Sequence, residues 1–295
     1  MVIKVELIIN NNQYDYEYFL DSQVSIIQIG LEGFCSGYLK TYPLEQISFI
    51  ASKIHKNNKR IYLSLNIIAN EDTIECLKKI ITQLSQLEID GFVVADFGIF
   101  QILKEANLTN KIVFNPVTNI TNKYSANIIN NLGINHCCIA NELNLKDVLD
   151  ISNYNDGNVE ILAQGYYQIC NSKRSLLTNF FKKHKLKNKS DYYYIKEESR
   201  DYSYPIIEIN NETLVYIDRQ RCILPYLTQI SEAKIKYLRI DTMFLTLHEI
   251  QKHIETYNKV IKNPNLIDSE LENIITYSNS NLKCLDNISI LKKEK

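Results

Sequence analysis

Two cations and two hydroxyl groups stand together in the short segment Ser172-Lys173-Arg174-Ser175. The segment follows Gly165, a residue type that lets the backbone turn or approach a ligand closely where a strand ends. Arginine binds phosphate and carboxylate groups through two parallel hydrogen bonds, and lysine adds a point charge. The segment therefore fits an anionic ligand, and a solvated basic loop before a helix fits the same residues equally well.

A second basic stretch runs to residue 189 and is followed by three tyrosines at 192–194. Basic residues interleaved with aromatic ones suit a phosphate backbone with unstacked bases, as in single-stranded RNA. A solvated helix face is the competing interpretation. The lysines that we expect to contact RNA are Lys182, Lys183, Lys185, Lys187 and Lys189.

Polar residues follow nearly all of the predicted strands, whose C-terminal ends would carry the working groups of a barrel. Turns favour Asn and Asp anyway, which explains about half of this pattern. The remainder predicts a pocket for a small ligand or a nucleobase. Carboxylates brought together there would raise at least one pKa and permit acid–base chemistry. The ring comprises Asn10, Gly30, Asn66, Asp96, Asn115, Glu142, Gln164 and Asp241. The predicted substrate-binding residues are Asn66, Asp96, Asn115, Glu142, Ser172, Lys173, Arg174 and Asp241.

Metal-binding and protease signatures are weak in this sequence. There is no C-x-x-C or H-E-x-x-H motif, and the adjacent Cys137 and Cys138 would point to opposite sides of a strand. Ser172, Ser175 and Cys222 are possible nucleophile types, but no G-x-S-x-G elbow or Cys/His arrangement accompanies them. The residues therefore predict no metal site, give little support to a histidine-assisted protease, and assign no catalytic residue.

Short apolar runs alternate with segments of helical spacing, a pattern that predicts a parallel sheet. Eight such runs predict a closed (β/α)₈ TIM-like barrel. An open doubly wound sheet is the alternative, because the spacing between runs is uneven. The expected strands are Ile3–Ile9, Ile26–Ile29, Ile61–Leu65, Gly91–Ala95, Lys111–Phe114, His136–Ala140, Val159–Ala163 and Lys236–Ile240.

The long interval before the last predicted strand divides the chain. Residues 1–164 would form the first seven βα units, and residues 165–235 a β-rich insert with the basic loop and run. Within the insert, Pro205–Ile209 and Leu214–Ile217 would form a hairpin around Asn210-Asn211. Residues 236–262 would supply the last strand and helix, and residues 263–295 a C-terminal helix with a frayed tail.

Composition sets the broad class. The 295 residues are 45% hydrophobic and 23% charged, and the formal net charge is −1, so any nucleic-acid site must be a local patch. No apolar stretch is long enough for a transmembrane helix, and the first residues have a strand pattern and not that of a signal peptide. Seven cysteines at irregular spacing argue against a disulfide framework, which makes the cytoplasm the simplest expectation.

Several segments resemble those of the U32 (collagenase-like) peptidase family, in the same order. Gly165 is followed by Ser-Lys-Arg-Ser-Leu-Leu at 172–177 and Asn-Phe-Phe at 179–181. Four further matches are Ala140–Leu145, Tyr204–Glu208, Arg221–Ile223 and Tyr237–Asp241, the last followed by Thr242 where the family usually has Gly. The chain is most similar to a short bacterial branch of this family, in which paired proteins are implicated in 5-hydroxylation of the wobble uridine of tRNA.

This resemblance implies tRNA as a partner and participation in wobble-uridine hydroxylation. Cluster-bearing members of the family hold an iron–sulfur cluster through four cysteines, whose positions fall here at Gln168, Ser175, near Tyr192, and Cys222. With one thiol of four, the chain is expected to bind no cluster alone, and a cluster-bearing paralogue is the expected partner. Peptidase activity and a non-catalytic RNA-binding scaffold are the alternatives.

Overall fold

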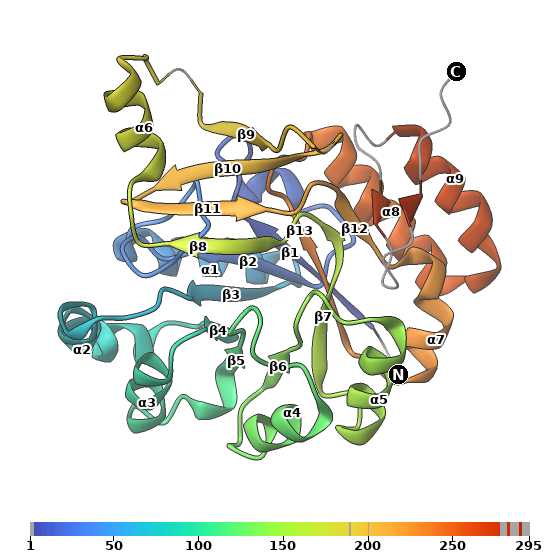
Figure 1. Cartoon of the computed structure of the whole chain (residues 1–295). Coiled ribbons are helices and arrows are strands. Elements are labelled where there is room, and N and C mark those ends of the chain that lie inside the picture. Colours follow the sequence, from blue (N-terminus) through green and yellow to red (C-terminus); the bar gives the residue numbers. More distant parts are fainter. Residues whose placement is uncertain (1–2, 189, 200, 278–281, 284–288, 291–295) are drawn as a thin grey trace.

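Eight parallel strands close on themselves in the larger sheet of the protein (Figure 1). The computed structural model describes residues 3–188, 190–199, 201–277, 282–283 and 289–290. The last barrel strand pairs with both the first and the seventh, which closes the barrel. The predicted TIM-like barrel is confirmed, and the open-sheet alternative is wrong. The barrel strands are β1 (Lys4–Ile9), β2 (Ile26–Gly30), β3 (Arg60–Leu65), β4 (Gly91–Val94), β5 (Ile112–Phe114), β6 (His136–Cys138), β7 (Val159–Gly165) and β13 (Tyr237–Asp241).

Helices surround the barrel and begin at capping residues in the loops that follow the strands. The side chains of Asn70, Asp96, Asn122, Asn144 and Thr246 accept backbone N–H groups at five of these N-termini. Short 3₁₀ segments lie at Tyr16–Phe19, Thr109–Lys111, Leu224–Tyr226 and Pro264–Leu266. The helices are α1 (Leu44–Lys56), α2 (Glu71–Gln86), α3 (Phe97–Glu105), α4 (Lys123–Asn130), α5 (Leu145–Tyr154), α7 (Leu227–Glu232), α8 (Leu247–Lys262) and α9 (Ile267–Tyr277).

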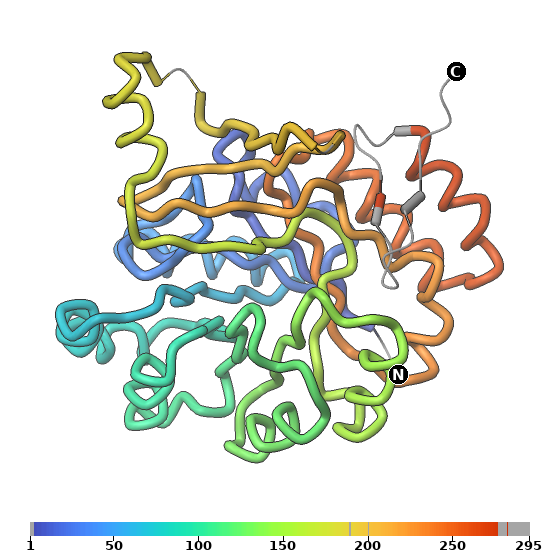
Figure 2. The backbone as a smooth tube through the Cα atoms, in the orientation of Figure 1, coloured from blue at the N-terminus to red at the C-terminus, as the bar shows by residue number. Residues whose placement is uncertain are grey.

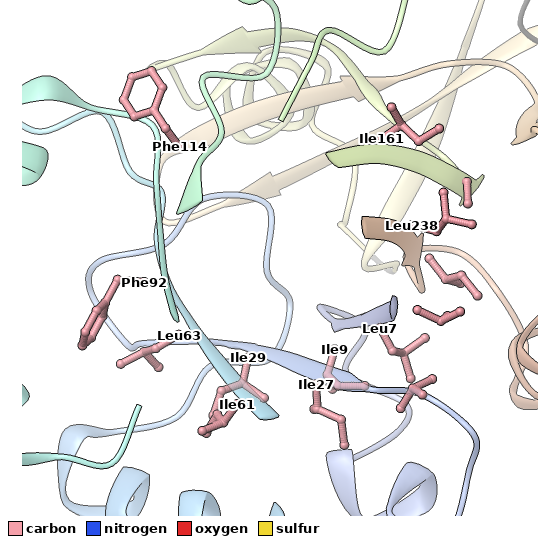
Figure 3. Close-up of a cluster of buried hydrophobic side chains, with 14 of the residues drawn as sticks. Leu7, Ile9, Ile27, Ile29, Ile61, Leu63, Phe92, Phe114, Ile161 and Leu238 are labelled. Carbon is pink, nitrogen blue, oxygen red and sulfur yellow. The ribbon is translucent and has the colours of Figure 1, made fainter. Parts of the chain in front are cut away.

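The hydrophobic core lies between the barrel and its helices, where apolar side chains from neighbouring strands pack together (Figure 3). Burying one such Leu or Ile stabilises the fold by about 1.5–3 kcal/mol. Cys137 belongs to this outer layer, whereas Cys138 belongs to a separate cluster with Tyr62 and Tyr237. The prediction that the two cysteines point to opposite sides is therefore confirmed.

The alternate positions of the barrel strands are unusually polar. Glu6, Gln28, Ser64, Glu160 and Arg239 are all buried, although each lies within a barrel strand. Because successive side chains of a strand point to opposite faces, these residues lie opposite the apolar outer layer. The barrel interior thus holds polar and charged groups beside the smaller apolar cluster to which Cys138 belongs.

The insert is a four-stranded antiparallel sheet in the order β8-β11-β10-β9, with β8 (Gln168–Ser172), β9 (Tyr192–Lys196), β10 (Ser203–Ile209) and β11 (Glu212–Tyr216). β10 and β11 form the predicted hairpin, and Asn210 and Asn211 at its turn have φ values of 51° and 63°. A further strand, β12 (Gln220–Cys222), pairs antiparallel with β7 and joins the insert to the barrel sheet.

A helix of the insert, α6 (Leu176–His184), projects beyond the insert strands on the side away from α8 and α9 (Figures 1 and 2). Near the C-terminus, the short strands β14 (Leu282–Lys283) and β15 (Ser289–Ile290) pair with each other, and β14 pairs with β12. These two strands were not predicted, and the final Lys-Lys-Glu-Lys lies outside the described residues. No helix among the described residues is long and apolar enough to span a membrane.

Candidate site at the barrel mouth

A cavity of about 80 Å³, here called the inner chamber, lies at the carboxyl ends of the barrel strands. Six carboxamide side chains line it, together with Arg239 and Asp241 from β13. The start of the insert covers it, because Tyr166, Tyr167 and Gln168 also line the cavity. The six carboxamides belong to Asn10, Gln28, Asn66, Asn115, Asn141 and Gln168.

A wider cavity of about 300 Å³, here called the outer groove, adjoins the inner chamber. The two share Ser36, Asn66, Val117 and Gln168 in their walls. The edge strand β8 forms one wall of the groove, and the loops after β3 and β5 form the other. The two cavities together form a mouth with a deep polar end and a broad open end.

Asp241 is held in place by neighbours from both ends of the chain. Its Oδ1 accepts hydrogen bonds from Asn10 Nδ2 and from the amide of Met243, each at 2.9 Å. Burial raises the pKa of Asp241, although these hydrogen bonds oppose the shift. Gly165 permits this arrangement: its φ is +117°, and a Cβ on it would lie 2.5 Å from the carbonyl oxygen of Asp241. A glycine at the end of β7 is therefore required by both its backbone angle and this close approach.

One wall of the inner chamber is a hydrogen-bonded set of neutral groups. Gln28 Nε2 donates to Tyr38 Oη and to Ser64 Oγ, both at 2.6 Å, and the two hydroxyl oxygens are 2.5 Å apart. Burial raises the pKa of Tyr38 well above its usual value, so the phenol stays protonated. Gln28 Oε1 is buried and has no hydrogen-bond partner among the described residues.

Arg239 is anchored by a buried ion pair inside the barrel. Its Nη1 lies 3.2 Å from Glu160 Oε1, and His136 Nε2 lies 2.8 Å from the other oxygen of Glu160. Burial alone would raise the pKa of Glu160, but His136 and Arg239 outweigh it and lower that pKa to about 2. Burial raises the pKa of the neighbouring Glu6 well above its usual value, and the charge of Glu160 adds to the shift. The network therefore holds the Glu160 carboxylate against the Arg239 guanidinium, and the pKa of Glu6 is shifted in the opposite direction to that of Glu160.

The structure brings some of the predicted substrate-binding residues to the mouth. Asn66, Asn115 and Asp241 line the inner chamber. Asp96 instead accepts the amides of Gly98 and Ile99 as the N-cap of α3, and Glu142 is exposed in a turn. The three predicted acids are therefore not brought together, because one carboxylate caps a helix and another faces solvent.

The basic loop also lies outside both cavities. Ser172 ends β8, and Lys173 Nζ lies 3.1 Å from Glu212 Oε1, so that lysine already has a counterion. Ser36 and Asn171 donate to the same carboxylate, which ties the insert to the loop after β2. The Arg174 side chain is exposed, and its carbonyl accepts the hydroxyl of Thr213.

The lysines expected to contact RNA gather on and just after α6. Lys182 and Lys183 lie exposed in its last turn, Lys185 ends it in a left-handed conformation, and Lys187 follows exposed. Phe180, half exposed, lies 4.6 Å from the ring of His184. This face carries cations beside an exposed aromatic ring. Lys189 lies outside the described residues.

The positions that would carry cluster ligands do not form such a site. Gln168 lines the two cavities at the start of β8, whereas Ser175 Oγ contacts Asn211 at the hairpin turn, at the opposite end of β11 from the partner of Gln168. Cys222 is fully buried, 4.0 Å from the hydroxyl of Tyr257. The residues present therefore do not fit an iron–sulfur cluster. No group of three or more His, Cys, Asp or Glu in the described ranges could hold a metal ion.

Sequence reasoning missed several polar residues of the inner chamber, among them Gln28, Asn141, Tyr167, Gln168 and Arg239. The signal for Arg239 was available, since a charged residue within the apolar run 237–240 must face the barrel interior. Tyr167 and Gln168 follow the end of β7, but nothing local indicates that the chain turns back over the mouth there.

The sequence and structure were compared with known proteins. The profile of peptidase family U32 matches residues 15–288. The chain is 25% identical over 229 residues to tRNA hydroxylation protein P2 of Bacillus subtilis, covering 73% of this chain and 74% of that protein. It is 25% identical over 140 residues to the 23S rRNA 5-hydroxycytidine C2501 synthase of Escherichia coli, covering 47% of this chain and 21% of the synthase.

Two further relatives were found. The chain is 25% identical over 112 residues to tRNA hydroxylation protein P of Helicobacter pylori strain 26695, covering 38% of this chain and 26% of that protein. The solved structure of the U32 peptidase Mk0906 covers 81% of this chain and 92% of its own, with 14% identity and a TM-score of 0.47. Because the family profile spans nearly the whole sequence, the chain belongs to peptidase family U32.

Proposed function

We propose that this protein takes part in RNA modification, specifically the 5-hydroxylation of the wobble uridine of tRNA. The observation that carries the proposal is the similarity to tRNA hydroxylation protein P2 over about three quarters of both chains. A relative that modifies rRNA is also a hydroxylation enzyme by name, which supports RNA hydroxylation as the shared chemistry.

The geometry supports an RNA substrate. The mouth offers carboxamides, which can donate to and accept from a base edge. The α6 face offers lysines beside an exposed aromatic ring, which suits a phosphate backbone with unstacked bases. In this proposal the mouth holds the base and the α6 face holds the flanking stem-loop.

We further propose that the protein works as one half of a pair. Hydroxylation requires an oxygen donor and a redox centre, and the four cluster positions here carry a single thiol. A cluster-bearing paralogue would supply the redox centre, and this subunit would bind the RNA or complete the substrate pocket. The purified chain should then be colourless. A brown iron species formed by anaerobic reconstitution would contradict this if it depended on Cys222 and on Cys170, an exposed thiol of β8 two positions from one of the cluster positions.

Peptidase activity is the second candidate, which only the family membership favours. Hydroxyl and thiol nucleophiles need a nearby base. None of the histidines lines the inner chamber or the outer groove in the described part of the chain. The mouth therefore offers no imidazole to activate a nucleophile.

Three measurements on co-expressed proteins test this proposal. The protein and its four-cysteine paralogue should co-elute in size-exclusion chromatography, with the mass of the complex given by light scattering. A complex that survives the column implies an interface of at least about 1,000 Å². The complex should bind tRNA and leave casein and gelatin uncleaved. Separate elution would contradict the paired arrangement, and cleavage without RNA binding would favour the peptidase.

A further inference from the structure

We propose that the inner chamber is the binding site for a single extruded pyrimidine base, which its carboxamides and Tyr167 recognise through hydrogen bonds. This inference rests on the proposed function and adds where the base binds and which residues select it. Four observations carry it: the charge balance of the chamber, its unpaired polar atoms, its size, and the position of the outer groove.

The charges of the chamber disfavour an anionic ligand. Arg239 lines the chamber, but its charge is matched by Glu160 at 3.2 Å. The Asp241 carboxylate accepts two hydrogen bonds from Asn10 and the Met243 amide. An anionic ligand would therefore find no cation in the described chamber walls that is not already paired with a carboxylate.

Unpaired donors and acceptors both remain in the chamber walls. Gln28 Oε1, Asn141 Oδ1 and Arg239 Nε are buried and have no partner among the described residues. The Asn115 amide nitrogen and the Tyr167 hydroxyl have no hydrogen bond that the described residues account for. Of these groups, the Asn115 amide nitrogen can donate to a ligand in the chamber, and the Tyr167 hydroxyl can both donate and accept. A pyrimidine base edge does both.

Two residues of the chamber wall, Asn141 and Tyr167, are themselves buried. Arg221, itself buried, donates through Nη1 to the carbonyl oxygen of Asn141. Tyr167 is 7% exposed, and burial raises its pKa to about 12, so its hydroxyl keeps its proton. A site with fixed donors and acceptors rejects ligands that cannot pair with them.

The dimensions agree with one ring. The threshold for holding one water is roughly 10–15 Å³, and the inner chamber, at about 80 Å³, exceeds it several times over, which suits a ligand of one ring. A purine is larger. The outer groove of about 300 Å³ adjoins the chamber and leaves room for the ribose and phosphate of the same nucleotide. Chemistry on a base requires its removal from the stack, which such a chamber provides.

The test compares three anticodon stem-loop RNAs that differ only at the first anticodon position: uridine, an abasic residue, or adenosine. Binding to the full chain is measured by fluorescence anisotropy at one fixed salt concentration. The uridine RNA should bind at least about fivefold more tightly than the other two, the value of one net hydrogen bond.

Substitutions in the chamber test whether the difference in affinity between the uridine and abasic RNAs arises there. Tyr167→Phe and Asn115→Ala should each reduce the uridine-to-abasic ratio by about fivefold or to unity. Both should leave the affinity for the abasic RNA unchanged. Gln83→Ala removes an exposed carboxamide of α2 that lines neither cavity and should leave the ratio as in the wild type.

Equal affinity of the wild type for uridine and abasic RNA would overturn the inference while leaving the proposed function intact. A ratio that persists in both chamber variants would place the base elsewhere and would also overturn it. Failure of every RNA to bind would contradict the proposed function itself.

Discussion

Asn10 Nδ2 donates to Asp241 Oδ1 over 2.9 Å, which joins the ends of the first and last barrel strands across 231 positions of sequence. Thr242 completes the contact by donating its hydroxyl to Asn10 Oδ1, also at 2.9 Å. Because this pair lines the inner chamber, closure of the barrel and construction of the candidate site are the same event. Changes that disturb the junction of β7, β13 and β1 should therefore affect both stability and ligand binding.

Substituting Gly165 tests that junction. Gly165→Ala should destabilise the protein by at least about 3 kcal/mol, because it adds backbone strain and overpacking against the Asp241 carbonyl. The matched control is Gly33→Ala, since Gly33 also has positive φ but nothing lies within 4 Å of the added Cβ. The control should show only the backbone cost of about 1–2 kcal/mol. Equal urea midpoints for the two variants would show that the close approach is absent.

The buried ion pair between Glu160 and Arg239 should contribute more to the free energy of unfolding than any exposed ion pair. Glu160→Gln removes the only ionised partner of Arg239 that the described residues provide, and breaking such a pair costs about 3–5 kcal/mol. Asp150→Asn, which breaks the exposed Lys146–Asp150 pair, should leave the urea midpoint nearly unchanged. A Glu160→Gln variant as stable as the wild type would mean that Arg239 is solvated.

The fully buried His253 should make the protein sensitive to acid. Burial lowers the pKa of His253 to about 4, below the value of about 6.5 in the unfolded chain. The unfolded state therefore binds the proton first. The stability contributed by the neutral ring is complete above about pH 6.5 and is lost as pH falls towards 4, by about 3 kcal/mol in total.

The variant His253→Gln isolates this effect, because glutamine does not titrate. Unfolding free energies measured by urea denaturation between pH 7 and 4.5 should fall less steeply in the variant than in the wild type. Identical slopes would assign the acid sensitivity to other groups.

Removing cations from α6 should weaken RNA binding in a salt-dependent way. Lys182→Ala with Lys183→Ala should reduce the slope of log affinity against log salt by about 1.4 to 1.8 if each lysine contacts one phosphate. Lys78→Ala with Lys79→Ala removes the same charge from the exposed face of α2 and should leave the slope unchanged. The thermal midpoint should stay nearly constant in both variants. Equal slopes for the two variants would make α6 a merely solvated helix.

Removing the cations of the basic loop at 172–175 should change the salt dependence of RNA affinity less than removing those of α6. Glu212 already neutralises Lys173, so Lys173→Ala with Arg174→Ala should change the slope by about one phosphate contact and not two. A change as large as that of the α6 variant would show that RNA displaces Glu212 from Lys173.

The sequence was sufficient to predict the barrel because apolar strands and helical spacing are local signals. It also identified Asn66, Asn115 and Asp241, since the ends of parallel strands converge whatever their loops do. It could not separate Asp96 from them, because an Asp after a strand serves equally well as a helix cap or as a ligand.

The sequence could not predict that the start of the insert, at residues 166–168, covers the inner chamber. Tyr167 and Gln168 contact the chamber only because β8 joins a sheet whose pairing spans residues 168–216, a long-range relationship. The counterion of Lys173 is likewise set by the pairing of β8 with β11. Tertiary pairing therefore decided which of the predicted polar residues face the cavity and which are neutralised.

Nucleoside mass spectrometry of tRNA tests the central claim most directly. Digested tRNA from a strain lacking this gene should lose 5-hydroxyuridine-derived nucleosides at the wobble position, and the wild-type gene should restore them. The Tyr167→Phe and Asn115→Ala variants should restore them only in part, whereas Gln83→Ala, at an exposed position of α2 that lines neither cavity, should restore them fully. Unchanged wobble hydroxylation in the deletion strain would contradict the account.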